Sequence, residues 1–163
     1  RARGAAVLGR VLGSGHATEG EGILAIRDDG EGPARAMRAA LADAGIEARD
    51  VAMIVAHGNG TPASDASEGR AILEVFGGAP PPVTAFKWSI GHLIAAAGAI
   101  EAVLALEALR RGVVPGIPVL ERVDPACAGL PVSRETRASA GDVALVLSRG
   151  FGGTDGALVV RAA

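Results

Sequence analysis

The sequence predicts an α/β fold, in which buried strands alternate with helices along the chain. The segment 51–56, VAMIVA, is a short continuous apolar run, which is typical of a strand buried on both faces. Ala36, Met37, Ala40 and Leu41 recur instead at helical spacing. Strand and helix patterns follow one another until two final strands close the chain, and this alternation indicates a layered sheet with helices.

The first strand and helix are expected before residue 46. Residues 4–14 are predicted as a strand, and the polar, glycine-rich residues 15–31 mostly as a loop. Pro33 opens a helix, because proline is accepted in the first turn, and Gly45 ends it.

A second helix follows strand 51–56. Ser64 or Asp65 is expected to cap its beginning, and it ends at the glycine pair 77–78. A proline cluster then leads into a short strand at 83–86.

The remainder begins with a long Ala/Leu helix, which follows His92 and ends near residue 111. Residues 113–140 are predicted as an irregular connection. The apolar runs 142–150 and 157–162 are joined by a glycine-rich turn and are predicted to form a hairpin.

The composition predicts one globular domain over residues 1–163. Hydrophobic residues make up 49% and charged residues 21%, a balance that excludes disorder. The apolar region 93–109 is interrupted by Glu101 and Glu107, so it is predicted as a buried helix rather than a membrane span. The net charge of -2, without blocks of like charge, indicates neither nucleic acid nor a membrane as a partner.

The single cysteine, Cys127, permits no disulfide and no cysteine-based zinc site within the chain, and we expect no metal. A reducing compartment, the cytoplasm, is expected, and residues 1–10 lack the apolar core of a signal peptide. Neither a histidine nor a helix start lies near Cys127 in sequence to lower its pKa, so it is not expected to be a nucleophile.

His57 directly follows strand 51–56, within AHGNGT. The ends of buried strands are where α/β folds tend to place their sites, and Gly58 and Gly60 allow close approach of a ligand to the backbone. The alternative is a tight turn with an incidental histidine, and the spacing alone favours neither.

Lys87 and His92 belong to KWSIGH, which follows strand 83–86. Lys87 is the only lysine among 16 lysine and arginine residues, and arginine cannot replace its compact, titratable ammonium. A histidine at a helix N-terminus is held neutral by the dipole and can donate a hydrogen bond to a developing oxyanion. The alternative is a capping histidine beside a solvated lysine.

The turn GFGGTDG, residues 150–156, holds Phe151, one of three phenylalanines. Phe151 could gate a pocket or pack in the core, and taken alone the motif favours the core.

Together these motifs resemble those of elongating β-ketoacyl synthases. HGNGTPASDASE is similar to the HGTGT…D…E stretch of that family, KWSIGH to its K-x-x-x-G-H signature, and SRGFGGTDGALVV to its SFGFGGTN terminus. The motifs occur in the family's order and at matching separations, and the resemblance covers essentially all 163 residues.

The resemblance implies the C-terminal half of a thiolase-like fold, a five-layered α-β-α-β-α sandwich. It implies an acyltransferase, a β-ketoacyl-ACP synthase, that catalyses decarboxylative Claisen condensation of a malonyl thioester on acyl carrier protein with a cysteine-bound acyl chain. The N-terminal half, which carries that cysteine in the family, is expected to be absent, so this chain would act only with that half or a second subunit. No cofactor is expected, because the substrates are carried on the phosphopantetheine of acyl carrier protein, and a dimer-based assembly is expected.

The resemblance also assigns roles to single residues. His57 and His92 would donate hydrogen bonds to the malonyl thioester carbonyl, and Lys87, paired with Glu68, would organise the site. The remaining residues implied are supporting ones, Asp65 and Thr61, and an acyl-chain gate of Phe151 with Gly150 and Gly152.

Four residues depart from the family pattern. Asn59 replaces a threonine, and Asp155 an asparagine; both are modest changes. Leu147 and Arg149 stand where the family usually has asparagine and a first phenylalanine. We expect Arg149 to be exposed to solvent; the alternative is a contact with substrate entry or with the carrier protein.

Two other readings compete with the enzyme. One is a non-catalytic, chain-length-factor-like partner of an active synthase, against which the joint presence of His57, Lys87 and His92 argues. The other is a thiolase or an initiating synthase, which does not fit K-x-x-x-G-H. Acyl chain length and pathway, fatty acid or polyketide, stay open.

Overall fold

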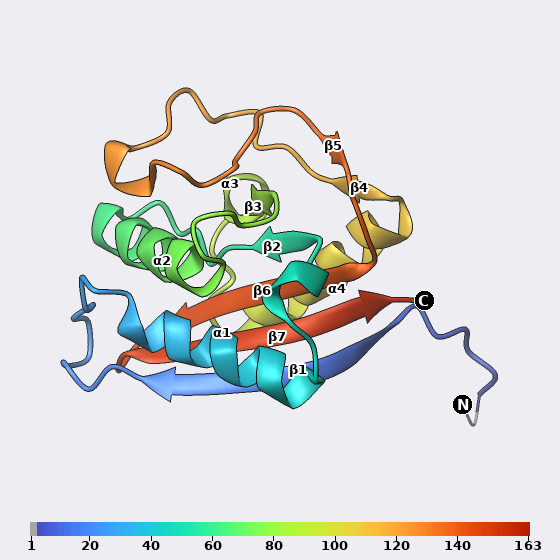
Figure 1. Ribbon diagram of the computed structural model, residues 1–163, viewed down its shortest axis with the longest axis horizontal. Helices are drawn as coiled ribbons and strands as arrows, with labels where there is room; N and C mark the ends of the chain where they lie inside the picture. Colours follow the sequence, from blue (N-terminus) through green and yellow to red (C-terminus); the bar gives the residue numbers. More distant parts are fainter. Residues whose placement is uncertain (1–2) are drawn as a thin grey trace.

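The computed structural model describes residues 3–163, which fold around a five-stranded sheet (Figure 1). In chain order, with 3-10 helices written η, the elements are β1 (Gly9–Thr18), α1 (Glu31–Ala44), η1 (Ala48–Asp50), β2 (Met53–Val55), α2 (Pro62–Val75), β3 (Val83–Thr84), α3 (Lys87–Ile90), η2 (Ile94–Ala96), α4 (Ala97–Arg110), β4 (Val113–Val114), η3 (Pro125–Cys127), β5 (Arg137–Ala138), β6 (Val143–Gly150) and β7 (Thr154–Ala162).

The sheet is mixed, with the strand order β1–β7–β6–β2–β3. β1, β7 and β6 pair antiparallel, whereas β6, β2 and β3 pair parallel. The predicted hairpin is β6–β7, and the predicted alternation of strands and helices is confirmed.

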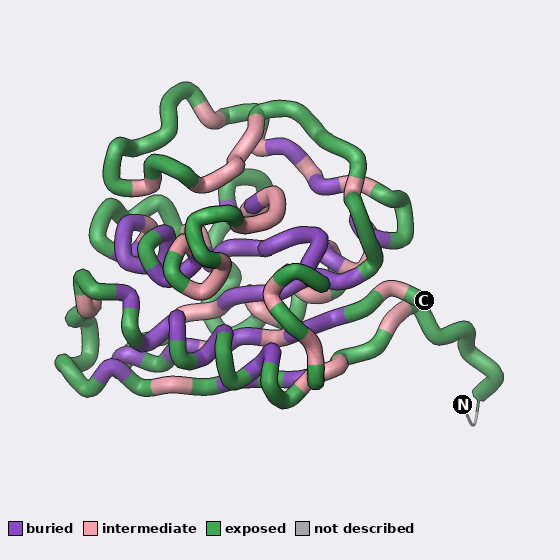
Figure 2. Tube along the Cα trace, in the orientation of Figure 1, coloured by how far each residue is buried: buried purple, intermediate pink, exposed green. Residues whose placement is uncertain are grey.

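Helices cover both faces of the sheet, with α1 and α2 on one face and α4 on the other (Figure 1). Ile54 and Leu145 pack in the core beneath α1 and α2. Met53 and Val146, which neighbour them along the strands, pack in the core beneath α4. Successive side chains of a strand point to opposite faces, so β2 and β6 are buried on both sides, as Figure 2 shows along the sheet.

The first strand begins later than predicted. The predicted strand 4–14 is observed as Gly9–Thr18, and residues 15–18, predicted as loop, pair with β7. The glycine content of this region reflects a packing requirement rather than a turn. A Cβ on Gly15 would lie 2.1 Å from the Ala36 carbonyl oxygen, so the strand needs glycine to lie against α1.

The boundaries of α1 follow the prediction closely. Pro33 lies in its first turn, and Gly45 closes it with a φ of 65°. The start of α2 differs from the prediction. Thr61 is its N-cap residue and Pro62 its first helical residue, so Ser64 and Asp65 lie inside the helix rather than capping it.

The long helix expected directly after His92 is divided. α3 ends at Gly91, whose φ of 72° is incompatible with a helix, and α4 begins only at Ala97. Among residues 3–163, no helix has both the length and the apolar character needed to cross a membrane. The connection 113–140 is largely irregular as predicted, with β4 and β5 forming a two-stranded sheet.

We predict that Gly15→Ala lowers the free energy of unfolding by about 1–3 kcal/mol, the usual cost of forcing an extra carbon into a packed core. The new Cβ would lie 2.1 Å from the Ala36 oxygen and 2.5 Å from the Ala40 nitrogen. The control is Gly156→Ala in β7, where the nearest atom is 3.7 Å away. Denaturant unfolding of both variants tests this, and equal stabilities would contradict the close approach of β1 and α1.

Candidate active site at the ends of β2 and β6

His57 lies two residues beyond the end of β2 and is almost completely buried. Its backbone N–H donates to Glu68 Oε1 at 2.7 Å, and the Gly58 N–H donates to Glu68 Oε2 at 3.0 Å. Its carbonyl oxygen accepts from Lys87 Nζ at 2.5 Å. Glu68 on α2 and Lys87 on α3 therefore fix the backbone of residue 57 through different atoms.

Lys87 forms an ion pair with Glu101 of α4, with 2.6 Å between Nζ and Oε1. The two side chains are 5% and 0% exposed. The predicted pairing of Lys87 with Glu68 is therefore wrong. The carboxylate of Glu68 accepts from two backbone N–H donors. The partner of Lys87 is instead Glu101, the charged residue inside the apolar helix.

The His57 ring accepts a hydrogen bond from the Arg149 backbone N–H, with 3.2 Å between that nitrogen and Nδ1. Burial, together with the positive charges of Lys87, His92 and Arg149, lowers the pKa of His57 to about 3. The ring is therefore neutral at physiological pH. Because Nδ1 is an acceptor, the hydrogen-bond pattern assigns the proton to Nε2.

His92 has the same arrangement in a more exposed setting. Its Nδ1 accepts from the Ile94 backbone N–H at 3.1 Å, which leaves Nε2 as the donor of the neutral ring. Ile94 adopts a φ of 52°, which is rare for a β-branched residue. His92 lies five residues before α4, so its expected position at the start of that helix is wrong.

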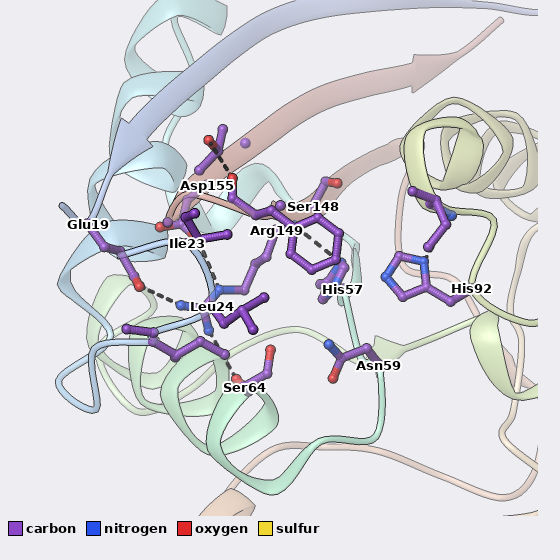
Figure 3. A pocket seen from close by; sticks show the side chains of 18 of the residues that line it. Glu19, Ile23, Leu24, His57, Asn59, Ser64, His92, Ser148, Arg149 and Asp155 are labelled. Atoms are coloured by element: carbon purple, nitrogen blue, oxygen red, sulfur yellow. Dashed lines mark hydrogen bonds and ion pairs between the residues drawn. The ribbon is translucent and has the colours of Figure 1, made fainter. Parts of the chain in front are cut away.

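The two imidazoles lie side by side. Their ring centroids are 5.3 Å apart and their planes meet at 75°. Figure 3 shows both rings in the same pocket, with His57 approached by the strand that carries Arg149. Two imidazole rings, each with Nδ1 occupied by a backbone N–H, thus share one site.

The carboxyl groups near His57 are buried as well. Burial raises the pKa of Glu68 to about 7, and this rise is opposed by the N–H groups of Gly58 and His57. Burial also raises the pKa of Glu101, which the hydrogen bond from Lys87 opposes. Both carboxyl groups are therefore held close to protein donors rather than to solvent.

A cavity of about 470 Å³ opens beside the two histidines (Figure 3). Its apolar side includes Ile23, Leu24 and Phe151. Its polar side includes Asn59, Ser64, Ser148, Arg149, Glu19 and Asp155.

The turn after β6 places Phe151 at the cavity, 71% exposed. The reading of Phe151 as core is therefore wrong. Gly150 also lines the cavity, and the Gly152 N–H donates to the Ile23 carbonyl at 2.8 Å. The gating role of these three residues stays a prediction.

Thr61 and Asp65 shape the loop rather than the cavity wall. The Asn59 side-chain oxygen accepts from the Thr61 N–H at 2.9 Å and also contacts the Thr61 hydroxyl, which closes an Asx turn before α2. Burial raises the pKa of Asp65, opposed by the N–H groups of Gly60 and Asn59. Their supporting role remains a prediction.

Arg149 is buried, contrary to the expected exposed position. Its side chain is 8% exposed and forms ion pairs with Glu19 and Asp155. Glu19 is a residue that the sequence did not single out, because it lies in a loop 130 residues away.

Cys127 lies in η3, half-buried, and burial raises the pKa of its thiol above the ordinary value. A raised pKa lowers the thiolate fraction, which agrees with the prediction that it is not a nucleophile. Across residues 3–163, the His, Cys, Asp and Glu side chains form no cluster of three suited to a metal ion.

Removing one partner of the Lys87–Glu101 pair should be severely destabilising. We predict that Lys87→Met lowers the free energy of unfolding by about 3–5 kcal/mol, because it leaves a buried carboxylate without its cation. The double variant Lys87→Met/Glu101→Leu should recover part of that loss. Arg110→Met, which breaks an exposed pair with Glu107 on the same helix, is the control and should cost below about 1 kcal/mol. Chemical denaturation measures all three, and equal losses for Lys87→Met and Arg110→Met would contradict the buried pair.

Comparison with known proteins places this chain in a family. The family model described as the C-terminal domain of β-ketoacyl synthases matches residues 8–121. The 3-oxoacyl-[acyl-carrier-protein] synthase 2 of Synechocystis sp. is 40% identical over 154 residues, covering 93% of this chain and 37% of that protein. The protein of the same name from Staphylococcus aureus (strain COL) is 37% identical over 165 residues, covering 99% of this chain and 39% of the relative.

Solved structures of ketosynthases have the same fold. The ishigamide ketosynthase/chain length factor superimposes with a TM-score of 0.91 at 34% identity, covering 99% of this chain and 40% of that one. A type II polyketide synthase acyl-carrier protein in complex with its ketosynthase bound to the hexaketide gives a TM-score of 0.92 at 30% identity, again covering 99% and 40%. The chain thus spans well under half the length of the relatives it matches. It belongs to the β-ketoacyl synthase family, and it has the fold of the C-terminal half of the thiolase-like sandwich.

Proposed function

We propose that this chain supplies the decarboxylation and oxyanion site of a β-ketoacyl-ACP synthase. The observation that carries the proposal is the pair of imidazoles, His57 and His92, whose ring centroids are 5.3 Å apart beside one cavity. Each ring has Nδ1 occupied by a backbone N–H, so each offers Nε2–H as a donor. Two fixed donors in a partly buried site suit a carbonyl oxygen that gains negative charge.

The proposed reaction begins with the malonyl thioester on acyl carrier protein. Its carboxylate leaves as carbon dioxide, and the electron pair of the broken C–C bond forms an enolate on the thioester. His57 and His92 donate to the enolate oxygen. The enolate carbon then attacks the acyl thioester on a cysteine, which forms the new C–C bond and releases the cysteine thiolate.

The neutral state of His57 is what makes it useful in this step. An imidazole with a pKa of about 3 does not need to lose a proton before donating, and it does not transfer one to the enolate prematurely. Lys87 acts as a positioning residue, because its ammonium holds the His57 carbonyl while Glu101 balances its charge.

The apolar part of the cavity suits an acyl chain. Phe151, Ile23 and Leu24 are all strongly exposed at its rim. We propose that Phe151, between Gly150 and Gly152, gates this entry. We further propose that the substrate is carried on the phosphopantetheine of an acyl carrier protein, because one structural relative is a ketosynthase in complex with its acyl-carrier protein.

The nucleophilic cysteine is proposed to come from a partner, either the N-terminal half of the synthase or a second subunit. Helix α4 supports this, since its inner face packs on the sheet while Ile100 and Val103 are 41% and 62% exposed on the outside. Leu93 and Ile94, just before the helix, are exposed as well, and we propose that they belong to the same interface. An apolar surface of this kind is typical of an interface between proteins or domains.

A chain-length-factor-like role is the second candidate. Two of the structural relatives are described as ketosynthase complexes with a chain length factor. The two Nε2–H donors and the Lys87–Glu101 pair favour the catalytic role, because a non-catalytic subunit has no need of an oxyanion site.

The first test is malonyl-ACP decarboxylation by the protein that contains this chain, followed as carbon dioxide release. We predict that His57→Ala and His92→Ala each lower the rate by about 10²–10³-fold, the usual cost of removing one oxyanion donor. Arg38→Met, in an exposed ion pair between α1 and α2, serves as a folding control and should keep the wild-type rate. Unchanged rates in both histidine variants would support the non-catalytic candidate.

The second test concerns the partner surface. We predict that the chain purified alone self-associates through its exposed apolar side, and that Val103→Asp shifts it toward monomer in sedimentation. Val119→Asp is the control, because Val119 is 60% exposed but lies in the irregular connection. A monodisperse 16.2 kDa wild-type species would contradict the prediction.

A further inference from the structure

Arg149, Glu19 and Asp155 form a buried charge cluster beside His57. Arg149 Nε lies 2.9 Å from Asp155 Oδ1, and its Nη2 lies 2.5 Å from Glu19 Oε1. Its Nη1 donates to the Ser64 carbonyl at 3.2 Å. All three guanidinium nitrogens therefore have an acceptor, and each acceptor comes from a different part of the chain (Figure 3).

The backbone of Arg149 is free to bind His57 because of the sheet register. β2 pairs with β6 only as far as Val146, whereas β6 continues to Gly150. On the β2 side, the N–H of Arg149 therefore meets the His57 ring that follows β2, at 3.2 Å from Nδ1. The same residue thus has its backbone on the histidine and its side chain in the charge cluster.

The charge cluster holds this strand end from several directions. Asp155 is the cross-strand neighbour of Arg149 in β7. Glu19 follows β1, and its second oxygen accepts the Arg27 N–H at 3.1 Å. Ser64 belongs to the first turns of α2, the helix that also carries Glu68.

The surrounding fold is shaped to admit the charge cluster. A Cβ on Gly32 of α1 would lie 2.2 Å from Asp155 Oδ2 and 2.7 Å from Glu19 Cγ, so any larger residue there would displace both carboxylate side chains. All three charged side chains are at least 92% buried, at 8%, 1% and 2% exposed. Burial raises the pKa of Asp155 to about 6, which the charge of Arg149 opposes. A buried cation between two carboxylates would be costly if it only filled space.

We propose that Arg149 is a positioning residue, whose guanidinium fixes the end of β6 so that its own backbone N–H keeps His57 in the Nε2–H form. The inference rests on the proposed function in one respect only, which is that the reaction uses the His57 Nε2–H as a donor. It also explains why an arginine at this position is paired with an aspartate six residues later. The side chain acts on the reaction through the His57 ring and does not touch the substrate.

The test is ¹⁵N NMR of histidine-labelled protein in its complete assembly, with the His57 signals assigned by His57→Ala. Wild-type His57 should show an unprotonated Nδ1 and a protonated Nε2. Arg149→Met should move these signals toward a mixture of the two neutral forms and should lower the protection of the residue 149 amide against exchange by about tenfold or more, as expected for local opening. Arg161→Met is the matched control, because Arg161 lies on the same hairpin and pairs with Asp142 at the surface.

If Arg149→Met fails to fold because two buried carboxylates lose their cation, the neutral variant Glu19→Gln/Arg149→Met/Asp155→Asn provides the same readout without a buried charge. An unchanged His57 tautomer and unchanged amide protection in a folded variant would overturn the inference. The NMR result does not depend on substrate. A tautomer shift in a protein without decarboxylase activity would therefore refute the proposed function while the positioning role of Arg149 stood.

Discussion

The site depends on holding His57 buried with its backbone N–H, its carbonyl and its Nδ1 occupied, so that only Nε2–H is left to donate. Its N–H is bound by Glu68, its carbonyl by Lys87 and its Nδ1 by the Arg149 backbone. These partners come from α2, α3 and β6, so the ring position follows from the packing of three elements rather than from one turn. An unpartnered buried polar group costs about 1–3 kcal/mol. Displacing any one of these elements would therefore destabilise the ring position that the other two maintain.

This arrangement is expensive for a domain of this size. Glu68, Lys87 and Glu101 are all buried, and burial raises the pKa of both carboxyl groups. The attraction between Lys87 and Glu101 offsets desolvation, but a buried ion pair seldom adds net stability over an apolar pair. Stability instead comes from the two apolar cores on either side of the sheet. The charges are therefore best explained by the geometry they impose on His57.

Much of the fold follows from local patterns, because strand alternation and helix spacing are visible along the sequence. The histidines could be singled out for the same reason: each stands next to a strand or glycine signal. The ion pairs could not be predicted from the sequence in this way. Glu101 is visible in the sequence only as a charge inside an apolar run, and the pairing of Lys87 with Glu101 rather than with Glu68 depends on how α4 packs against β6 and β7. Arg149 was placed in solvent because Glu19 lies far away in sequence and becomes its neighbour only through β1–β7 pairing.

The two histidines differ in exposure, yet the backbone makes them chemically alike. His57 is buried and His92 is exposed, but each has a backbone N–H on Nδ1 and so presents Nε2–H. Ile94, which donates to His92, also lines the cavity and is 63% exposed. We propose that it belongs, with the exposed apolar side chains of α4, to the partner interface. A partner that covers this surface would therefore also cover the open side of the cavity next to His92. Exclusion of water strengthens hydrogen bonds to a developing charge. Binding of the partner would therefore itself activate the oxyanion site.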